Sequence, residues 1–301
     1  MRLLTSLIFK VSLSSMILTA PAMRTGNTDD AGKHYVTSEK AANKPFYTAT
    51  VIRKFVDHPS VRAVRAVVRT DAGVSASRSV EHKSIATNAG FTAARAAELR
   101  LVIDQAELLY VSMHLDSTGL DQKAFEYAWR GYHNLLKKRM IRKRSVLSIC
   151  DFSQSSSSKR MYVIDVRHKK LLYRTYVAHG QNSGEEYATS FSNAPDSYKS
   201  SLGFYLTQWT YYGRNGLSLR LNGVDSGFND MAFKRNIVLH GSSYVSDQYM
   251  QEFGELGTSL GCPALPSTVS RTIIRALKGG SCLFIYHPTA EYLGGSSIIN
   301  G

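Results

Sequence analysis

Two residues with the chemistry of an acyl-transfer enzyme stand out between positions 237 and 263. The β-branched run at 237–239 predicts a short strand that ends at His240, and Cys262 follows 22 positions later between a glycine and a proline. A cysteine that only packs usually lies in an apolar run, whereas this one lies at a turn, where a substrate can reach the thiol. Because a thiolate is the nucleophile and an imidazole can accept its proton near neutral pH, the pair predicts a cysteine acyl-transfer site.

Two alternatives to this pair have less support. A zinc site needs at least three ligands, and the chain has no C-x-x-C or H-x-x-x-H pattern, so we expect neither a metal nor another cofactor. His179 is a rival for the base, but it ends a strand much earlier in the chain, and lining the cleft is the other role open to it. We expect surface or packing roles for six histidines outside the signature, namely His34, His58, His82, His114, His133 and His168.

The residues around the pair carry a specific resemblance. His-Gly-Ser at 240–242, followed by a loop and Ser-x-Gly-Cys at 259–262, resembles the signature of the L,D-transpeptidases, the YkuD-like cell-wall enzymes. The resemblance covers about residues 145–292: the region 180–203 occupies the place of the family's Thr-Pro-x-Gly-x-Tyr region, and the segments 218–221 and 227–230 resemble the murein L,D-transpeptidase branch. Two positions depart from the pattern, because Leu260 replaces the family's second histidine and Pro263-Ala264 fill the places of its usual arginine or asparagine.

The resemblance implies a reaction. Cys262 would attack a carbonyl of a peptidoglycan stem peptide, while His240 takes the thiol proton and then protonates the departing D-alanine amine. The thioester would pass its acyl group to an amine of a neighbouring stem, which makes a cross-link, or to water, which trims the stem. A carbapenem should acylate the same thiol. An L,D-carboxypeptidase or endopeptidase with the same site, and a non-catalytic envelope-binding module, are the alternatives.

Further residues are candidates for the site on this interpretation. The N–H groups of Gly261 and Cys262 would stabilise the oxyanion, and a carbonyl within 241–243 or the Ser259 hydroxyl would orient His240. Arg220 would pair with a substrate carboxylate or form a surface salt bridge. Candidates for further substrate contacts are Tyr244 and Ser242, which follow the histidine, and Asn229, which lies with Asp230 in a glycine-flanked loop that either binds a ligand or makes a turn.

Residues 1–22 predict a secretory signal peptide, because a positive start precedes a short apolar stretch and an Ala-Pro-Ala ending. An uncleaved anchor is the alternative. No second apolar stretch of spanning length follows, so we expect an exported protein of the periplasm or cell envelope, without a stable membrane span after cleavage. Cysteines usually pair in such a compartment, and their odd number leaves Cys262 unpaired. We expect Cys150 and Cys282 to be buried free thiols rather than a disulfide.

The chain is strongly basic, with 37 Lys and Arg against 23 Asp and Glu and a formal charge of +14. Such a balance favours polyanionic partners. Behind a signal peptide, we expect the basic run at 137–144 to be a solvated helix end or to contact anionic envelope polymers, and we expect no binding of nucleic acid.

The patterning divides the chain into five segments. After the signal peptide, residues 23–91 predict a flexible, basic and Ser/Thr/Ala-rich segment. Apolar residues at three- and four-residue steps predict helices within 92–144. From 145 to 292, short apolar runs between Gly, Ser and Asn loops predict a mainly antiparallel β sandwich or barrel, with one helix at 267–277 capped by Ser267. Residues 293–301 predict a frayed tail. The fold class is therefore mainly β, an L,D-transpeptidase-type catalytic domain preceded by a short α-helical segment.

Overall fold

The computed structural model describes residues 78–301, and their side chains from residue 92 on. The predicted signal peptide at 1–22 and most of the segment predicted as flexible therefore lie outside the described residues. Within the described part of the chain, no helix is both long enough and apolar enough to cross a membrane.

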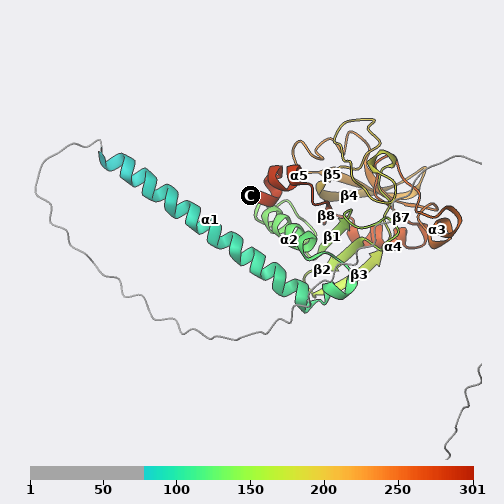
Figure 1. Cartoon of the computed structure of the whole chain (residues 1–301), viewed down its shortest axis with the longest axis horizontal. Helices are drawn as coiled ribbons and strands as arrows, with labels where there is room; N and C mark the ends of the chain where they lie inside the picture. Colours follow the sequence, from blue (N-terminus) through green and yellow to red (C-terminus); the bar gives the residue numbers. More distant parts are fainter. Residues whose placement is uncertain (1–77) are drawn as a thin grey trace, which may run out of the picture. The chain divides into compact units, whose positions relative to one another are not determined.

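An eight-stranded sheet forms the centre of the described chain (Figure 1). Its strand order is β3-β2-β1-β8-β4-β5-β6-β7, and neighbouring strands are antiparallel except for the parallel pairs β1–β8 and β6–β7. Apolar runs in the sequence predict all of these strands except β7, which is too short for a period to show. The strands are Val146–Asp151 (β1), Met161–Asp165 (β2), Lys170–Thr175 (β3), Gly203–Gly213 (β4), Gly216–Gly223 (β5), Val238–Ser242 (β6), Ala264–Pro266 (β7) and Cys282–Tyr286 (β8).

The two edges of this sheet meet. Ala178, just beyond the end of β3, pairs with Ala264 in β7 through N–H to carbonyl distances of 2.9 and 3.3 Å. This contact nearly closes the sheet into a barrel and covers edge groups that an open sheet would leave unpaired. The predicted fold class, a mainly β sandwich or barrel, is confirmed.

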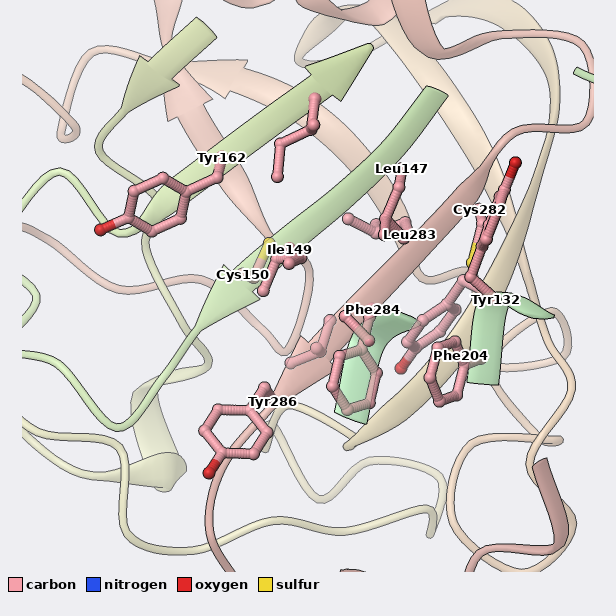
Figure 2. Close-up of a cluster of buried hydrophobic side chains, with 14 of the residues drawn as sticks. Tyr132, Leu147, Ile149, Cys150, Tyr162, Phe204, Cys282, Leu283, Phe284 and Tyr286 are labelled. Carbon is pink, nitrogen blue, oxygen red and sulfur yellow. The ribbon is translucent and has the colours of Figure 1, made fainter. Parts of the chain in front are cut away.

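Helix α2 (Gln122–Lys137) packs on β1 and β8. Its N-cap is Asp121, whose side chain accepts a main-chain N–H of the first turn at 2.9 Å. A Cβ at Gly131 would lie 2.0 Å from the ring of Phe204, so the glycine permits the helix to approach the sheet closely. Figure 2 shows the buried side chains of β1, β4 and β8 in one cluster, where the rings of Phe204 and Phe284 stack 4.2 Å apart.

All three cysteines are free thiols, as expected. Cys150 and Cys282 lie in neighbouring strands, but the register pairs Leu147 with Cys282 and Cys150 with Ile285. Since side chains alternate along a strand, the two buried thiols lie on opposite faces of the sheet, where a disulfide cannot join them.

Helix α1 (Arg78–Ser112) begins within the segment predicted as flexible, and that boundary is corrected. The missed part is the stretch 78–91, where the sequence has only a weak apolar period. Residues 92–101 of the helix are exposed. Further along, Val102, Ala106 and Leu109 are buried in the core that α1 shares with α2. The 3-10 turn η1 (Leu115–Thr118) then leads into α2.

The segment 293–301 is packed rather than frayed, which corrects the predicted tail. It belongs to helices α5 (Ala290–Gly295) and α6 (Ser297–Asn300), and both Ile298 and Ile299 are buried. A buried carboxylate holds this end in place: Asp225 accepts hydrogen bonds from the Ser296 hydroxyl and from the Tyr292 hydroxyl at 3.1 Å. The sequence hides this anchor because the carboxylate lies far upstream.

Two helices flank the loop that carries Cys262. Helix α4 (Ser267–Leu277) has the predicted bounds, but its N-cap is Pro266 and Ser267 is its first helical residue, so the predicted cap is wrong. Helix α3 (Asp247–Phe253), in the connection between β6 and β7, was not predicted.

Candidate active site

The parallel pair β6–β7 brings Cys262 and His240 into one region. The register pairs His240 with Ala264, and the His240 N–H reaches the Pro263 carbonyl at 3.4 Å. Cys262 therefore lies directly before β7 and alongside β6. The chain between the two residues leaves the sheet through α3 and returns to it at the cysteine.

Cys262 is half-buried, and its sulfur faces the start of β6. The Val238 N–H donates to Sγ at 3.4 Å, and the thiol donates to the Asn236 carbonyl at 3.8 Å. Burial raises the pKa of the Cys262 thiol, while the Val238 N–H and the charges of Arg235 and Arg220 act in the opposite direction. The thiol is thus unpaired, partly accessible and flanked by positive charge.

His240 is buried in β6, with 4% of its surface exposed. Its Nδ1 lies 3.0 Å from the Gly241 carbonyl, which can only accept, so Nδ1 carries the proton and Nε2 is the basic nitrogen. Burial lowers the pKa of His240, which keeps the ring neutral and able to take up a proton. The thiol of Cys262 is bonded to Asn236 rather than to this ring, so proton transfer requires its side chain to turn toward Nε2.

Ser259 shapes the loop that carries the cysteine. Its hydroxyl donates to the Cys262 carbonyl at 2.6 Å and accepts the Gly261 N–H at 3.0 Å, and its N–H donates to the His179 carbonyl at 2.9 Å. The suggestion that Ser259 orients His240 is corrected, because its hydroxyl is committed within the loop. The Gly261 N–H is bound as well and is not available as an oxyanion donor, whereas the Cys262 N–H has no acceptor among the described residues.

Gly261 is required by the backbone conformation of this loop. Its φ is +112°, and a Cβ there would lie 2.8 Å from the Lys199 carbonyl oxygen and 3.3 Å from the Arg235 guanidinium. The nucleophile loop, residues 259–263, therefore lies directly against Arg235 and the segment 192–201.

Arg220 shares a face of the sheet with His240. Ser218 in β5 pairs with His240, and Arg220 follows two residues later on the same face. Its guanidinium donates to the Asn236 side chain at 2.8 Å and lies over two aromatic rings at 5.3 and 5.4 Å. No ion pair of Arg220 occurs in the described chain, so the predicted surface salt bridge has no support. The other partner that we considered for this guanidinium is a substrate carboxylate.

Tyr244 and Ser242 follow His240 in the chain, and Tyr244 lies close enough to Cys262 for the two groups to act on each other. Burial raises the pKa of Tyr244 to about 12, against the effect of a hydrogen bond with the Ser242 side chain, and Cys262 also acts on this group. Ser242 further lines a cavity of about 600 Å³ at the ends of β3 and β6 and the start of α4. Neither Cys262 nor His240 lines this cavity, so the substrate contacts of Tyr244 and Ser242 stay predictions.

Asn229 does not reach the site. The residue is fully buried, its Oδ1 accepts the Asp225 N–H at 2.9 Å, and its Nδ2 donates to the Phe204 carbonyl at 3.0 Å. The predicted substrate contact of Asn229 is therefore corrected: both atoms of its amide are bound within the fold, and the loop that carries Asn229-Asp230 makes a turn.

A buried arginine beside the site was not predicted. Arg160 has no exposed surface, and its guanidinium donates to two main-chain carbonyls and to Nδ1 of His179, at 2.7–3.1 Å. Nε2 of His179 donates to the Gly184 carbonyl at 3.0 Å. Burial and the Arg160 charge lower the pKa of His179 to about 4. With both ring nitrogens bound, His179 is excluded as the rival base, although its main-chain carbonyl holds Ser259.

Metal-ligating side chains do not cluster in the described part of the chain, where no group of three or more His, Cys, Asp or Glu residues is placed to hold a metal ion. Nδ1 of His240, the histidine of the same site as Cys262, is hydrogen-bonded to the Gly241 carbonyl.

The chain matches the family model of the L,D-transpeptidase catalytic domain over residues 116–286. This match covers more than half of the chain, and the protein belongs to the L,D-transpeptidase family. The matched region begins before residue 145 and includes α2, which packs on the sheet as part of the same core.

Several solved structures are similar to the chain at low identity. They include an L,D-transpeptidase from Mycobacterium smegmatis (10% identity, TM-score 0.30, 48% of this chain and 59% of that one), an L,D-transpeptidase in complex with imipenem (12%, 0.30, 47% and 59%) and an L,D-transpeptidase from Stackebrandtia nassauensis (13%, 0.30, 55% and 67%). The chain spans less than two thirds of the length of the first two. No curated protein matches it.

Proposed function

We propose that the protein is an exported cysteine L,D-transpeptidase of the cell envelope, which forms a thioester with a peptidoglycan stem peptide and transfers the acyl group to an amine. One observation carries the proposal. The free, half-buried thiol of Cys262 lies against β6, and the same strand holds His240 as a neutral imidazole whose Nδ1 is fixed on the Gly241 carbonyl.

The proposed reaction has two steps at these atoms. Sγ of Cys262 attacks a stem-peptide carbonyl while Nε2 of His240 takes the thiol proton; the C–N bond breaks, and the leaving amine receives that proton. A second amine then attacks the thioester carbonyl, gives up its proton through the same nitrogen, and the thiol is regenerated. The Cys262 N–H is the proposed oxyanion donor, and Arg220 the proposed partner of a substrate carboxylate.

Water in place of the second amine would make the same site an L,D-carboxypeptidase or endopeptidase. Incubation of the full chain with muropeptide monomers separates these outcomes, because dimers indicate transfer to an amine and released tripeptides indicate hydrolysis. Cys262→Ala is the control for both. If the Cys262→Ala protein preserved the phenotype of the wild type in cells, the fold would serve as an envelope-binding module instead.

Acylation by a carbapenem tests the nucleophile itself, and a structural relative is known in complex with imipenem. We expect intact-mass analysis of the folded chain to show one imipenem adduct, located at Cys262 by peptide mapping. A folded protein with no adduct, or with the adduct on another residue, would contradict the proposal.

Export is the remaining part of the proposal. We expect the first residues of the chain recovered from the cell envelope to follow position 22, because residues 1–22 carry the features of a cleaved signal peptide. Sequencing of the N-terminus of the native protein measures this directly, and an intact Met1 would indicate an anchor.

A further inference from the structure

Arg235, in the turn before β6, holds one loop through four hydrogen bonds. Its Nη1 donates to the Ser192 carbonyl at 2.8 Å and to the Ser201 hydroxyl, and its Nη2 donates to the Lys199 carbonyl at 2.7 Å and the Ser197 hydroxyl at 3.1 Å. The planar fork of a guanidinium suits such a task, because its donors have fixed directions. This side chain therefore joins four residues of the segment 192–201 to the base of β6, and Asn182 and Ser183 also bind the segment.

This segment is under backbone strain and touches the nucleophile loop. Asp196 and Tyr198 have φ of 54° and 53°, in a region that residues with a side chain adopt rarely. The Lys199 carbonyl and the Arg235 guanidinium are the nearest atoms to the open side of Gly261. The guanidinium is thus in contact with the residue that directly precedes Cys262.

The charge of Arg235 has no ion-pair partner among the residues that the structure describes. All four of its acceptors are neutral, and no carboxylate forms an ion pair with it in the described chain. The side chain is half-buried, so water screens its field only in part. The titratable groups that act on the guanidinium are Tyr205, Cys262 and Asp196, and those around the thiol are Arg235, Arg220 of β5, Tyr244 and, on β6, His240.

We infer that Arg235 is a positioning residue for this site and that its charge favours the thiolate of Cys262. The inference rests on the proposed role of Cys262 as the nucleophile. The fork fixes the segment 192–201 against the nucleophile loop, and the positive charge opposes the cost of burying an anionic sulfur. The two residues that follow the cysteine, Pro263 and Ala264, carry no charge that could do this, so the chain supplies the arginine from a distant turn.

The pH profile of alkylation tests this inference and needs no peptidoglycan. The full chain is treated with iodoacetamide across a range of pH, and modification of Cys262 is followed by mass spectrometry, since the other two cysteines are fully buried. Arg235→Gln is expected to move the midpoint of the pH profile of alkylation to higher pH. It should also slow alkylation at neutral pH by about threefold to tenfold, because one pKa unit changes the thiolate fraction tenfold.

Three variants separate charge from structure. Arg235→Lys keeps the charge and loses the fork, so its midpoint should stay that of the wild type. Ser197→Ala removes one acceptor of the fork and should leave the midpoint unchanged. Arg167→Gln removes an equal charge from an exposed position between β2 and β3 and should also have no effect.

A cooperatively melting Arg235→Gln protein with the wild-type profile would overturn the inference, as would equal shifts in Arg235→Gln and Arg235→Lys. If Arg235→Gln does not fold, the salt dependence of the wild type and of Arg235→Lys decides. Screening should slow the neutral-pH alkylation of both, and rates independent of salt would overturn the inference. Iodoacetamide is not a substrate of the proposed reaction. If the alkylation midpoint shifts as expected but the protein makes no muropeptide product, the result contradicts the proposed function and not the role of Arg235.

Discussion

Two buried histidines lie beside the nucleophile loop, and they differ in what their ring nitrogens touch. His179 is 1% exposed and His240 is 4% exposed. Both nitrogens of His179 are bound, one by Arg160 and the other by the Gly184 carbonyl, whereas a carbonyl binds only Nδ1 of His240. Burial does not separate the two residues. The difference lies in Nε2 of His240, which has no protein partner within the described chain.

The charge around each ring makes the difference larger. Burial and the adjacent Arg160 lower the pKa of His179 to about 4, and the lone pair of its Nδ1 is directed at that guanidinium. For His240, burial lowers the pKa while the Gly241 carbonyl acts in the opposite direction. A neutral ring with one available nitrogen can take a proton from a thiol, and a neutral ring with two bound nitrogens serves as a structural acceptor.

Exchange of each histidine for glutamine should give opposite results. His240→Gln is expected to slow acylation of Cys262 by imipenem at least about a hundredfold, since a positioned base contributes about 10²–10⁴-fold. His179→Gln is expected to lower the free energy of unfolding by about 1–3 kcal/mol, because it disturbs the partner of the buried Arg160, and to change the acylation rate far less.

Intact-mass time courses measure the acylation rates, and urea denaturation measures the stability of both variants. The wild type at equal concentration is the control. Equal losses of acylation rate in folded His179→Gln and His240→Gln would remove the distinction between the two rings.

Protonation of His179 should make stability depend on pH. The folded ring has a pKa of about 4 against 6.5 as the reference value. Between these values the unfolded chain binds a proton that the folded chain does not. The contribution of His179 is therefore complete above about pH 6.5 and is lost as the pH falls through about 4, by an amount of about 3 kcal/mol.

Urea unfolding at several pH values in this window measures the slope for the wild type and for His179→Gln. The variant should lose less stability than the wild type as the pH falls. Its curve should not become flat, because the lowered pKa of His240 acts with the same sign. Parallel curves for the two proteins would show that the ring of His179 is not the group that titrates.

The His240–Cys262 pair could be predicted from the sequence, whereas the Arg160–His179 network could not. His240 and Cys262 are marked by their immediate neighbours, an apolar strand and a Gly-Cys-Pro turn, and local patterns are visible in a single chain. Apolar runs predicted most of the strands for the same reason, but not where each strand ends. The network of Arg160 and His179 depends on burial, which residue type alone does not reveal, because most arginines lie at the surface.

Asn229 and the segment 293–301 show the same limit from the other side. A polar loop residue and a short glycine- and serine-rich end both suggest exposure, yet both are held by partners distant in the sequence. Asn229 donates to the Phe204 carbonyl, and the Asp225 carboxylate binds Ser296. The start of helix α1 was missed for a different reason, since the sequence from 78 to 91 has only a weak apolar period.

Ser259 connects the main chain of His179 to the nucleophile loop, and its replacement should show a smaller effect. Ser259→Ala removes the hydroxyl that binds the Cys262 carbonyl and the Gly261 N–H, and it is expected to lower the free energy of unfolding by about 1–2 kcal/mol. Acylation should slow by about tenfold or less, because a loosened loop positions the sulfur less well while the freed N–H can still face an oxyanion. Ser259→Thr, which keeps the hydroxyl, is the matched control. An unchanged stability of Ser259→Ala would show that the loop does not depend on this hydroxyl.

Tyr244→Phe should have the smallest effect, and it tests whether His240 acts without help from the phenol. Burial raises the pKa of Tyr244 to about 12, so the group stays protonated and could donate to an oxyanion. Loss of a true oxyanion donor costs about 10²–10³-fold. We expect a loss of about threefold or less in the rate of acylation, because the Cys262 N–H is the proposed oxyanion donor. Ser242→Ala, which removes the neighbouring hydroxyl and keeps the phenol, is the control. A hundredfold loss in Tyr244→Phe with little change in Ser242→Ala would place the phenol beside the reacting carbonyl, and the contrast between the two histidines would then describe only half of the site.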